Sequence, residues 1–424
     1  SNVYLHAYQI TKNHRYAEIA SDIFDYVLRD MTDSDGGFYS AEDADSEGEE
    51  GTFYLWEPEQ IACVLDRDEA RLFIAHYGLT ERGNFDKGKS ILNIATPAEE
   101  LAKQFGKDRD EVVNMLARAR AKAFVARAKR QRPHRDDKII TGWNGLMISS
   151  LAYGGAVLKE EKYTTAARRS AEFILRTLYK DGRLRRYYRD GHVVGEAFLD
   201  DYAFMVIGLI DLYEATFDAR WLSGAKQLSE EMIELFADTE QGGFFLAGRD
   251  GERLIARTRP GSDGAIPSGN SAAALALLKL GRLTMNQEFT AQGGTVLDTF
   301  SRQLEESPAY SSFMLEALSL WLGPAREIVI AGSAEAGDTK QMIALVRGKF
   351  LPNAVVLFHD SGKAGSAIET IVPFVKNQVG IGGKATAYVC ENYACKKPVQ
   401  TIGELEDLLT EISGRSGITP MGGQ

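Results

Sequence analysis

The sequence is poor in cysteine, has no long apolar run and lacks an excess of basic residues, and each shortage excludes a class of protein. Three cysteines, Cys63, Cys390 and Cys395, form no disulfide-dense pattern and are typical of a reducing compartment. No apolar stretch approaches the roughly 20 residues that span a bilayer. The first residues carry no charged segment followed by an apolar signal core. We therefore predict a cytoplasmic protein with no membrane partner.

Basic residues are outnumbered, because 49 lysines and arginines face 60 aspartates and glutamates, a formal net charge of -11. Such a chain repels polyphosphates, so we predict no nucleic-acid partner. The stretch 118–135 is strongly basic. A solvated helix face accounts for it in an acidic chain, and anion binding is the alternative. Apolar residues make up 44% of the chain, enough to bury a large core.

The sequence also lacks the short motifs of several enzyme classes. It contains no HExxH, GxSxG or GxxxxGK[ST] motif, so the sequence gives no support for a metalloprotease, a serine hydrolase or a P-loop enzyme. Cys390 and Cys395 lie five positions apart and have no second pair. Free thiols are therefore a better interpretation of these two cysteines than a zinc site. We predict no metal and no cofactor.

What the sequence does contain is one layout repeated four times. In each repeat, an apolar segment is followed by a short polar turn, an aromatic residue and an amphipathic segment. The turns with their aromatic residues are KNHRY ending at Tyr16, EEKY at Tyr163, DARW at Trp221 and NQEF at Phe289. Each repeat predicts a hairpin of two helices.

The two helices of a hairpin differ in how their apolar residues are distributed. Segments such as AFMVIGLIDLYEA (203–215) and SAAALALLKLGRL (271–283) are apolar nearly all round and must be covered on most sides. The helix that begins at Trp221 has one apolar stripe and can face water. An inner ring inside an outer ring satisfies both patterns. We predict a mainly α fold, an (α/α)6-type toroid of helical hairpins, and an open superhelix of helix pairs is the alternative.

The connections from one hairpin to the next are long and rich in glycine and aromatic residues. They read DGGFYSAED from Asp35, DGRLRRYYRDG from Asp181 and QGGFFLAGRDG from Gln241, which predicts short β-hairpins. In antiparallel hairpins all long connections fall at one end of the ring. That end also receives the N-termini of the inner helices.

The pattern of apolar residues changes along the chain, and these changes predict where one domain ends and the next begins. We expect the toroid over residues 1–324, with a helical insertion at 57–137. Short apolar runs such as EIVIAG and AVVLFH then predict a small C-terminal α/β region over 325–412. A glycine-rich flexible tail is expected at 413–424.

Several carboxylates belong to the loop-bearing end of the predicted ring. Glycoside chemistry needs two of them, one to protonate the departing oxygen and one to act as base or nucleophile, roughly 5 to 9.5 Å apart. We predict Asp201 as the acid–base group, with Asp43 or Asp137 as its partner.

Other polar and aromatic groups of the same end are predicted to bind the substrate. They are Glu42, Tyr39, Trp143, Asn144, Asp200, Tyr202, His192, Ser268 and Asn270. Each has a simpler reading. Asp, Ser and Asn ahead of an apolar helix are good N-caps, an aromatic residue at the base of a loop is often core, and a histidine on a hairpin is often only a surface residue.

Five strings together carry a family resemblance: GGFYSAEDADSEGEEGTFYLW, DDKIITGWNGLMISSLA, LDDYAFMVIGLIDLYEATFD, DGAIPSGNSAAALALLKL and TAYVCENYACKKPV. In this order they resemble the thioredoxin-domain-containing family that includes spermatogenesis-associated protein 20. The resemblance covers nearly the whole chain. It implies a six-hairpin glycosidase-like toroid, similar to N-acylglucosamine 2-epimerases, behind an N-terminal thioredoxin-like domain. We therefore expect this chain to be a fragment without that domain and without the first stretch of toroid.

Two functional hypotheses follow. The first is a carbohydrate-active toroid, a glycoside hydrolase or sugar epimerase, that takes a carbohydrate or small polar ligand. The second is a non-catalytic protein-binding scaffold partnered with the thioredoxin-like domain.

Overall fold

The computed structural model describes residues 1–251, 255–360 and 367–414, with side chains up to residue 410. The chain divides into two compact units. The first, which we call the ring unit, comprises residues 1–40 and 138–424, and the second, the inserted unit, comprises residues 41–137. Of the tail predicted at 413–424, residues 415–424 lie outside the described part of the chain.

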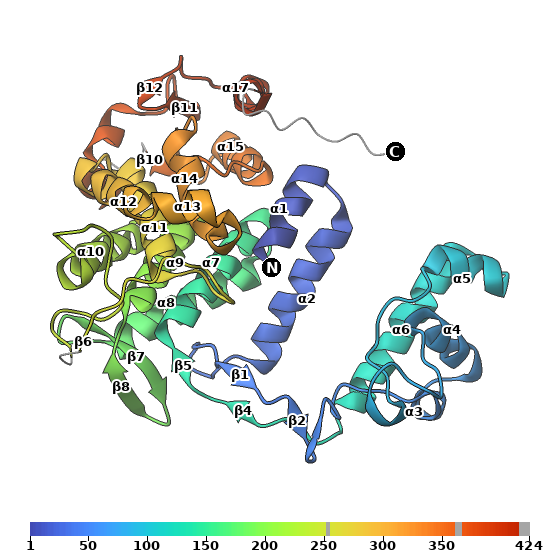
Figure 1. Ribbon diagram of the computed structural model, residues 1–424. Helices are drawn as coiled ribbons and strands as arrows, with labels where there is room; N and C mark the ends of the chain where they lie inside the picture. The colour runs from blue at the N-terminus through green and yellow to red at the C-terminus, as the bar shows by residue number, and fades with distance from the viewer. Residues whose placement is uncertain (252–254, 361–366, 415–424) are drawn as a thin grey trace. The chain divides into compact units, whose positions relative to one another are not determined.

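The ring unit is built from helical hairpins, which confirms the predicted (α/α)6-type toroid (Figure 1). The inner helices are α1 (Asn2–Thr11), α7 (Thr141–Leu158), α9 (Leu199–Thr216), α11 (Gly269–Thr284) and α14 (Ser312–Leu322). The outer helices are α2 (His14–Asp30), α8 (Glu161–Thr177), α10 (Ala219–Phe236) and α12 (Gln287–Thr299). Each inner helix packs against the next inner helix along the chain.

All four hairpins close through the same two-residue turn. The first turn residue is left-handed, with φ of 58° at Lys12, 60° at Lys159, 54° at Phe217 and 54° at Met285. The second turn residue caps the outer helix, and in three of the four its side chain accepts a hydrogen bond from a backbone N–H. The repeat predicted from the sequence is therefore present in the backbone, since one turn geometry occurs four times.

The inner helices approach one another closely because glycines face each other. A Cβ at Gly145 of α7 would lie 2.5 Å from the backbone of Phe204, and a Cβ at Gly208 of α9 would lie 2.6 Å from the carbonyl oxygen of Gly145. Such distances exclude any side chain at these positions without a shift of the helices. The outer helix α10, in contrast, buries one face, which includes Trp221 and Met232.

Short strands lie at the end of the ring where the inner helices begin. We call this end the loop end. The strands are β5 (Ile139–Ile140), β6 (Tyr179–Lys180), β7 (Arg183–Arg189) and β8 (His192–Glu196), with β7 paired antiparallel to the other three. The hairpin predicted after Asp181 is thus present. We call the other two connections, which contain Gly36–Phe38 and Gly242–Phe244, the GGF connections. The phenylalanine of each forms an isolated bridge, Phe38 with Thr32 and Phe244 with Ala237.

The C-terminal part of the ring unit is a small α/β region. Its sheet has the order β10-β9-β11-β12, with β9 parallel to β10 and antiparallel to β11. The strands are β9 (Arg326–Gly332), β10 (Ala354–Asp360), β11 (Thr386–Glu391) and β12 (Ala394–Cys395). The helices around them are α15 (Gly337–Gly348), α16 (Ala367–Ile371) and α17 (Ile402–Gly414), and α13 (Ser301–Glu306) precedes α14.

The inserted unit has its own small cores. One is centred on Trp56, Phe73 and Ala119, and the other on Leu72 and Leu116. Its helices are α3 (Pro58–Val64), α4 (Arg67–Tyr77), α5 (Ala98–Phe105) and α6 (Arg109–Arg127). Its strands are β1 (Ala41–Glu42), β2 (Asp45–Ser46), β3 (Glu49–Glu50) and β4 (Arg135–Asp136). Among the residues that the structure describes, none of the helices combines the length and apolar character needed to cross a bilayer.

Candidate functional site

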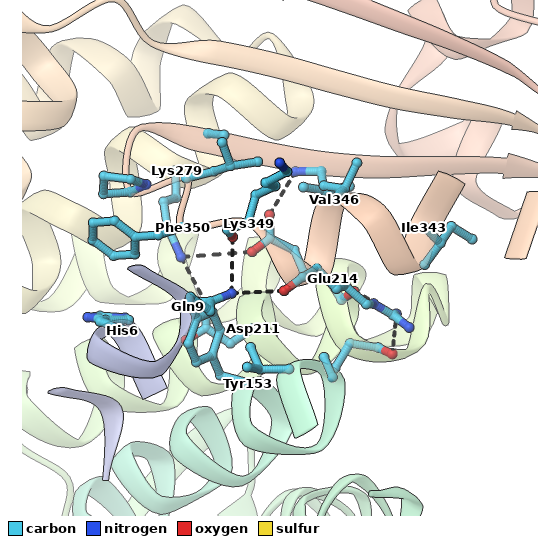
Figure 2. Close-up of a pocket in the computed structure, with 18 of the residues that line it drawn as sticks. His6, Gln9, Tyr153, Asp211, Glu214, Lys279, Ile343, Val346, Lys349 and Phe350 are labelled. Carbon is cyan, nitrogen blue, oxygen red and sulfur yellow. Dashed lines mark hydrogen bonds and ion pairs between the residues drawn. The ribbon is translucent and has the colours of Figure 1, made fainter. Parts of the chain in front are cut away.

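A cavity of the ring unit lies toward the C-terminal halves of the inner helices, which we call the cavity end (Figure 2). It has a volume of about 360 Å³ and is closed by residues of α15, the segment after it and β10. The inner helices contribute polar lining residues: His6, Gln9, Tyr153, Asp211, Glu214, Lys279 and Glu316. Arg347 and Lys349, from α15 and the segment after it, add two more. Val346 and Phe350 add apolar surface. A concave site with a few converging polar groups is the usual form of a ligand site.

An ion pair between two inner helices forms one wall of the cavity. Lys279 Nζ lies 2.9 Å from Asp211 Oδ1, and the hydroxyl of Ser149 donates to Asp211 Oδ2 at 2.5 Å. Burial by itself lowers the pKa of Lys279, but the carboxylates of Asp211 and Glu214 outweigh it and raise that pKa above its usual value. Lys279 is therefore a fixed positive charge in this cavity.

Burial shifts the pKa of two carboxyl groups of the lining, Glu214 and Glu316, upward. Burial raises the pKa of Glu214 to about 7, and the nearby Lys279, with Nζ 3.9 Å from Glu214 Oε2, limits the rise. The backbone N–H of Val356 in β10 donates to Glu214 Oε1 at 2.8 Å and orients the carboxyl group. A carboxyl group with a pKa close to neutral can both give and take a proton under physiological conditions.

Another part of the cavity lining is a chain of neutral hydrogen bonds. The hydroxyl of Tyr153 donates to Gln9 Oε1 at 2.5 Å, and Gln9 Nε2 donates to the carbonyl oxygens of Arg347 and Lys349 at 2.8 and 3.0 Å. Burial raises the pKa of Tyr153, so this hydroxyl keeps its proton. Burial, followed by the charge of Lys279, lowers the pKa of His6, whose ring packs edge-on against Tyr153. The imidazole is therefore neutral at neutral pH.

The arrangement joins a proton-exchanging carboxyl group to a lysine–carboxylate pair. A cavity that holds a carboxyl group with a strongly shifted pKa beside a charged partner is typical of acid–base chemistry. Sequence reasoning did not identify any of these residues as functional. The available signal was the presence of Asp211, Glu214 and Lys279 inside segments otherwise apolar nearly all round, because a charge there must be paired or face a cavity.

At the loop end, Asp201 is fully buried and held by hydrogen bonds. Arg186 Nη1 donates to both carboxylate oxygens at 2.7 Å. The backbone N–H groups of Gly142 and Phe198 donate at 2.8 and 2.9 Å. These contacts tie α9 to α7 and β7. They do not test the catalytic role predicted for Asp201, which stays a prediction.

Asn144 and Asn270 perform the same task in two different repeats. Asn144 accepts a hydrogen bond from the N–H of Phe38 at 2.7 Å and donates to its carbonyl oxygen at 3.0 Å. Asn270 likewise accepts a hydrogen bond from the N–H of Phe244 at 2.8 Å and donates to its carbonyl oxygen at 2.9 Å. Each asparagine thus clamps the GGF connection that precedes its helix. The substrate-binding role predicted for both remains untested.

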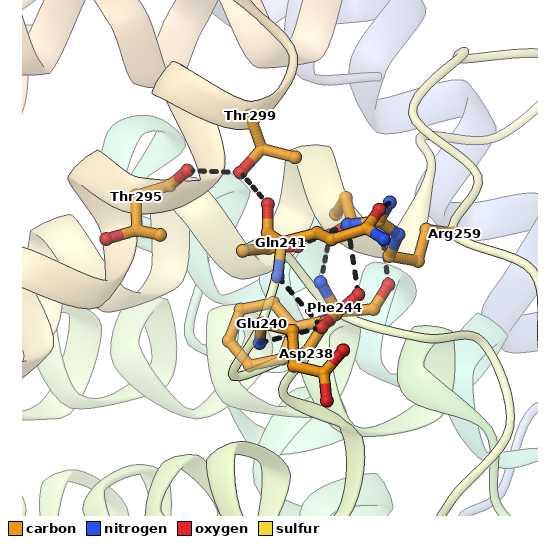
Figure 3. Close-up of polar contacts among 9 residues, drawn as sticks. Asp238, Glu240, Gln241, Phe244, Arg259, Thr295 and Thr299 are labelled. Atoms are coloured by element: carbon orange, nitrogen blue, oxygen red, sulfur yellow. Dashed lines mark hydrogen bonds and ion pairs between the residues drawn. The ribbon is translucent and has the colours of Figure 1, made fainter.

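The second GGF connection is also organised by its own side chains (Figure 3). Asp238 Oδ1 accepts from the N–H groups of Glu240 and Gln241 at 3.0 and 3.1 Å. Arg259 Nη1 donates to the carbonyl oxygen of Gly242 at 2.7 Å and lies 3.1 Å from Asp238 Oδ2. The polar groups of this connection are therefore engaged in shaping it.

Three further predicted residues of the loop end are Ser268, Tyr202 and Asp200. Ser268 caps α11 by accepting from the N–H of Ser271 at 3.1 Å. The buried hydroxyl of Tyr202 accepts from the N–H of Leu184 at 3.0 Å. Asp200 is largely buried, and burial, followed by the charge of Asp201, raises its pKa. Their roles in binding a substrate stay predictions.

The remaining predicted residues of the ring unit are Tyr39, Trp143 and His192. The hydroxyl of Tyr39 donates to Asp33 Oδ2 at 2.7 Å. Trp143, in the first turn of α7, is 41% exposed. His192 begins the exposed strand β8. The substrate-binding roles predicted for these three residues stay predictions.

Glu42, Asp43 and Asp137 belong to the inserted unit. Glu42 Oε2 accepts from the hydroxyl of Tyr54 at 2.8 Å, and the N–H of Asp43 donates to the carbonyl oxygen of His134 at 2.8 Å. Pairing of Asp43 or Asp137 with Asp201 stays a prediction.

The interpretation of Cys390 and Cys395 as free thiols was wrong. The two residues form a disulfide between β11 and β12, where they stand opposite each other. Spacing along the chain did not reveal this, because the hairpin register brings the two sulfur atoms together. Cys63 remains a free, exposed thiol.

No model of a protein family matches the chain. Spermatogenesis-associated protein 20 of Homo sapiens is 35% identical over 441 residues, which cover 96% of this chain and 56% of that protein. An uncharacterised protein of Caenorhabditis elegans is 29% identical over 430 residues, 94% of this chain and 58% of that protein. The chain thus spans little more than half the length of the curated relatives that it matches. The resemblance predicted from the five sequence strings is confirmed.

Solved structures of sugar-processing proteins are similar only at a distance. A GH76 α-mannanase of Bacteroides thetaiotaomicron is 14% identical with a TM-score of 0.36, covering 51% of this chain and 60% of that one. A D-mannose isomerase is 13% identical with a TM-score of 0.36, at 70% and 72% coverage. The unsaturated glucuronyl hydrolase of Bacillus sp. GL1 is 13% identical with a TM-score of 0.36, at 75% and 83% coverage. These values carry no argument about activity.

Proposed function

The chain is a homologue of spermatogenesis-associated protein 20 over nearly its whole length, and for this part of such a protein we propose a carbohydrate-active ring. The proposed activity is acid–base chemistry on a small saccharide, either hydrolysis of a glycosidic bond or epimerisation. We place the reacting end of the saccharide in the cavity of the ring unit rather than at the loop end.

One observation carries the proposal: the cavity combines the right size with both kinds of surface that a sugar requires. Its volume of about 360 Å³ falls in the range of small-molecule sites. Sugar hydroxyls are donors and acceptors, and the cavity supplies Asp211 and Lys279 as one acceptor and one donor. Phe350 supplies an apolar face for the C–H groups of a sugar ring.

In this proposal Glu214 moves the proton. Its pKa of about 7 allows the protonated form to donate to a departing glycosidic oxygen, or the ionised form to take a proton from a substrate carbon. The N–H of Val356 fixes one oxygen of the carboxyl group, which leaves Oε2 as the atom that exchanges the proton. Asp211, paired with Lys279, binds a substrate hydroxyl.

The experiment is a screen of mono- and disaccharides by calorimetry and by product analysis. For a saccharide that reacts, Glu214→Gln keeps the size and a hydrogen-bond acceptor of the side chain but removes the exchangeable proton. We expect a loss of kcat of at least about 100-fold, with a smaller change in binding. Glu234→Gln, at an exposed position of the outer helix α10, is the matched control and should leave both unchanged.

The same screen compares the two ends of the ring. Asp201→Asn tests the catalytic role predicted at the loop end. If activity survives in Glu214→Gln but is lost in a well-folded Asp201→Asn variant, the reaction takes place at the loop end and not in the cavity. If no saccharide binds to the wild-type chain, the carbohydrate proposal is wrong.

A protein-binding scaffold, partnered with a thioredoxin-like domain, is the second candidate. It is favoured by large apolar side chains exposed at the loop end, since Trp143, Phe198 and Val194 are 41%, 40% and 39% exposed. Exposed aromatic residues are common anchors of protein interfaces. Partner capture lost in Trp143→Ala, without saccharide binding, would support this candidate instead.

A further inference from the structure

The C-terminal sheet ends in a hairpin that carries a disulfide on its tip. Strands β11 and β12 pair Glu391 with Ala394 and Cys390 with Cys395, and the two cysteines are bonded. The bond belongs to the edge of the sheet, because β12 is the last strand in the order β10-β9-β11-β12.

As a structural staple this bond adds little. The two cysteines are five positions apart, and a bridge over so short a loop restricts the unfolded chain the least. The turn between them is already formed by Asn392 and Tyr393, whose φ values of 48° and 66° are typical of the two-residue turn that suits a β-hairpin. The N–H of Lys396 then donates to the carbonyl oxygen of Val389 at 3.0 Å and closes the next rung.

The hairpin tip is also held to the rest of the sheet without the disulfide. The N–H of Asn392 donates to the carbonyl oxygen of Ala325 at 2.9 Å, and the N–H of Tyr393 donates to Glu327 Oε2 at 3.2 Å. Glu327 is in turn paired with Arg282 of the inner helix α11 at 2.9 Å. Opening the bond therefore leaves the hairpin with its main contacts.

The two cysteines differ in their access to solvent. Cys390 is 3% exposed, because β11 lies between β9 and β12. Cys395 is exposed on the edge strand. An incoming thiolate can reach Cys395 but not Cys390.

We propose that Cys390–Cys395 is a thiol–disulfide exchange site that reacts with an external dithiol. The thiolate of the dithiol attacks Cys395 Sγ, the Cys390–Cys395 bond breaks, and Cys390 leaves as a thiolate that takes a proton from water. The second thiolate of the reagent then attacks its own sulfur in the mixed disulfide and releases Cys395. Two electrons and two protons pass to the protein, and the dithiol is oxidised to a disulfide.

The first experiment counts thiols in the folded chain. In a Cys63→Ser background, dithiothreitol treatment without denaturant, followed by acid quenching and alkylation in denaturant, should add two labels by mass spectrometry. Circular dichroism should not change, and oxidised glutathione should restore the unlabelled form. Labels that appear only when the dithiothreitol treatment itself is done in denaturant, or loss of structure on reduction, would assign the bond a purely structural role and overturn the proposal.

A matched pair of variants tests which sulfur is attacked. In the same background, Cys390→Ser leaves the exposed thiol and Cys395→Ser leaves the buried one. With oxidised glutathione, Cys390→Ser should form the mixed disulfide at least about 10-fold faster, because exchange rates depend on access. Equal rates in two folded variants, or a faster reaction in Cys395→Ser, would contradict attack at Cys395.

Discussion

The loop end and the cavity end of the ring both gather charged and polar side chains on the inner helices, yet they satisfy these groups differently. At the loop end, Asp201, Asn144 and Asn270 bond mainly to backbone groups of neighbouring connections. At the cavity end, Glu214 and Lys279 have fewer protein partners and line an open volume. A polar group saturated by backbone partners stabilises the fold, whereas one with unused bonding capacity can serve a ligand.

The largest expected effect on stability is at Asp201. Asp201→Ala removes the acceptor of Arg186 and of two backbone N–H groups in a fully buried position. We expect a loss of about 3 kcal/mol in the free energy of unfolding, because the donors lose their partner. Urea denaturation measures this, with Glu234→Ala as an exposed control. A loss below about 1 kcal/mol would remove the distinction between the two ends.

The next effect is a pH dependence at the cavity end. The pKa of Glu214 rises from 4.5 to about 7 on folding. The folded chain therefore holds this proton more tightly than the unfolded chain does. The contribution of Glu214 to stability is most favourable below the unfolded value and is lost as the pH rises through the folded value.

The measurement compares unfolding free energies of the wild type and Glu214→Gln at about pH 5 and about pH 8. The wild type should lose about 2 kcal/mol relative to the variant over this interval, less than the full shift implies, because the side chain keeps some exposure. Glu234→Gln should follow the wild type. The opposite slope would show that Glu214 is stabilised as a carboxylate, and its proposed proton transfer would lose its basis.

The smallest of these effects is at the GGF clamps. Asn270→Ala leaves the N–H of Phe244 without its acceptor, and we expect a loss of about 1.5 kcal/mol in the free energy of unfolding. Asn144→Ala should cost a similar amount, since it clamps Phe38 in the same way. Asn93→Ala, at an exposed position of the inserted unit, is the control. If either clamp variant keeps its stability but loses saccharide binding, the binding role predicted from the sequence is supported.

Much of the ring could be predicted from the sequence because its signals are local. The apolar residues of 203–215 and 271–283 alone indicate inner helices, and the aromatic residues at Tyr163 and Trp221 mark the start of outer ones. The site could not be located in the same way. Asp201 and Glu214 are both acidic residues of the same apolar helix, and the sequence does not reveal which one meets backbone donors and which one meets a cavity.

The sequence by itself determined the helical hairpins, their order and the inner and outer faces, because hydrophobic periodicity acts within one helix. The tertiary structure decided the rest. Glu214 acquires its raised pKa from the burial that α11 and β10 impose, and Cys390 meets Cys395 through strand register. The protonation of a carboxyl group and the pairing of two sulfur atoms depend on groups distant in the chain or on the exact path of the backbone, and neither is encoded in local composition.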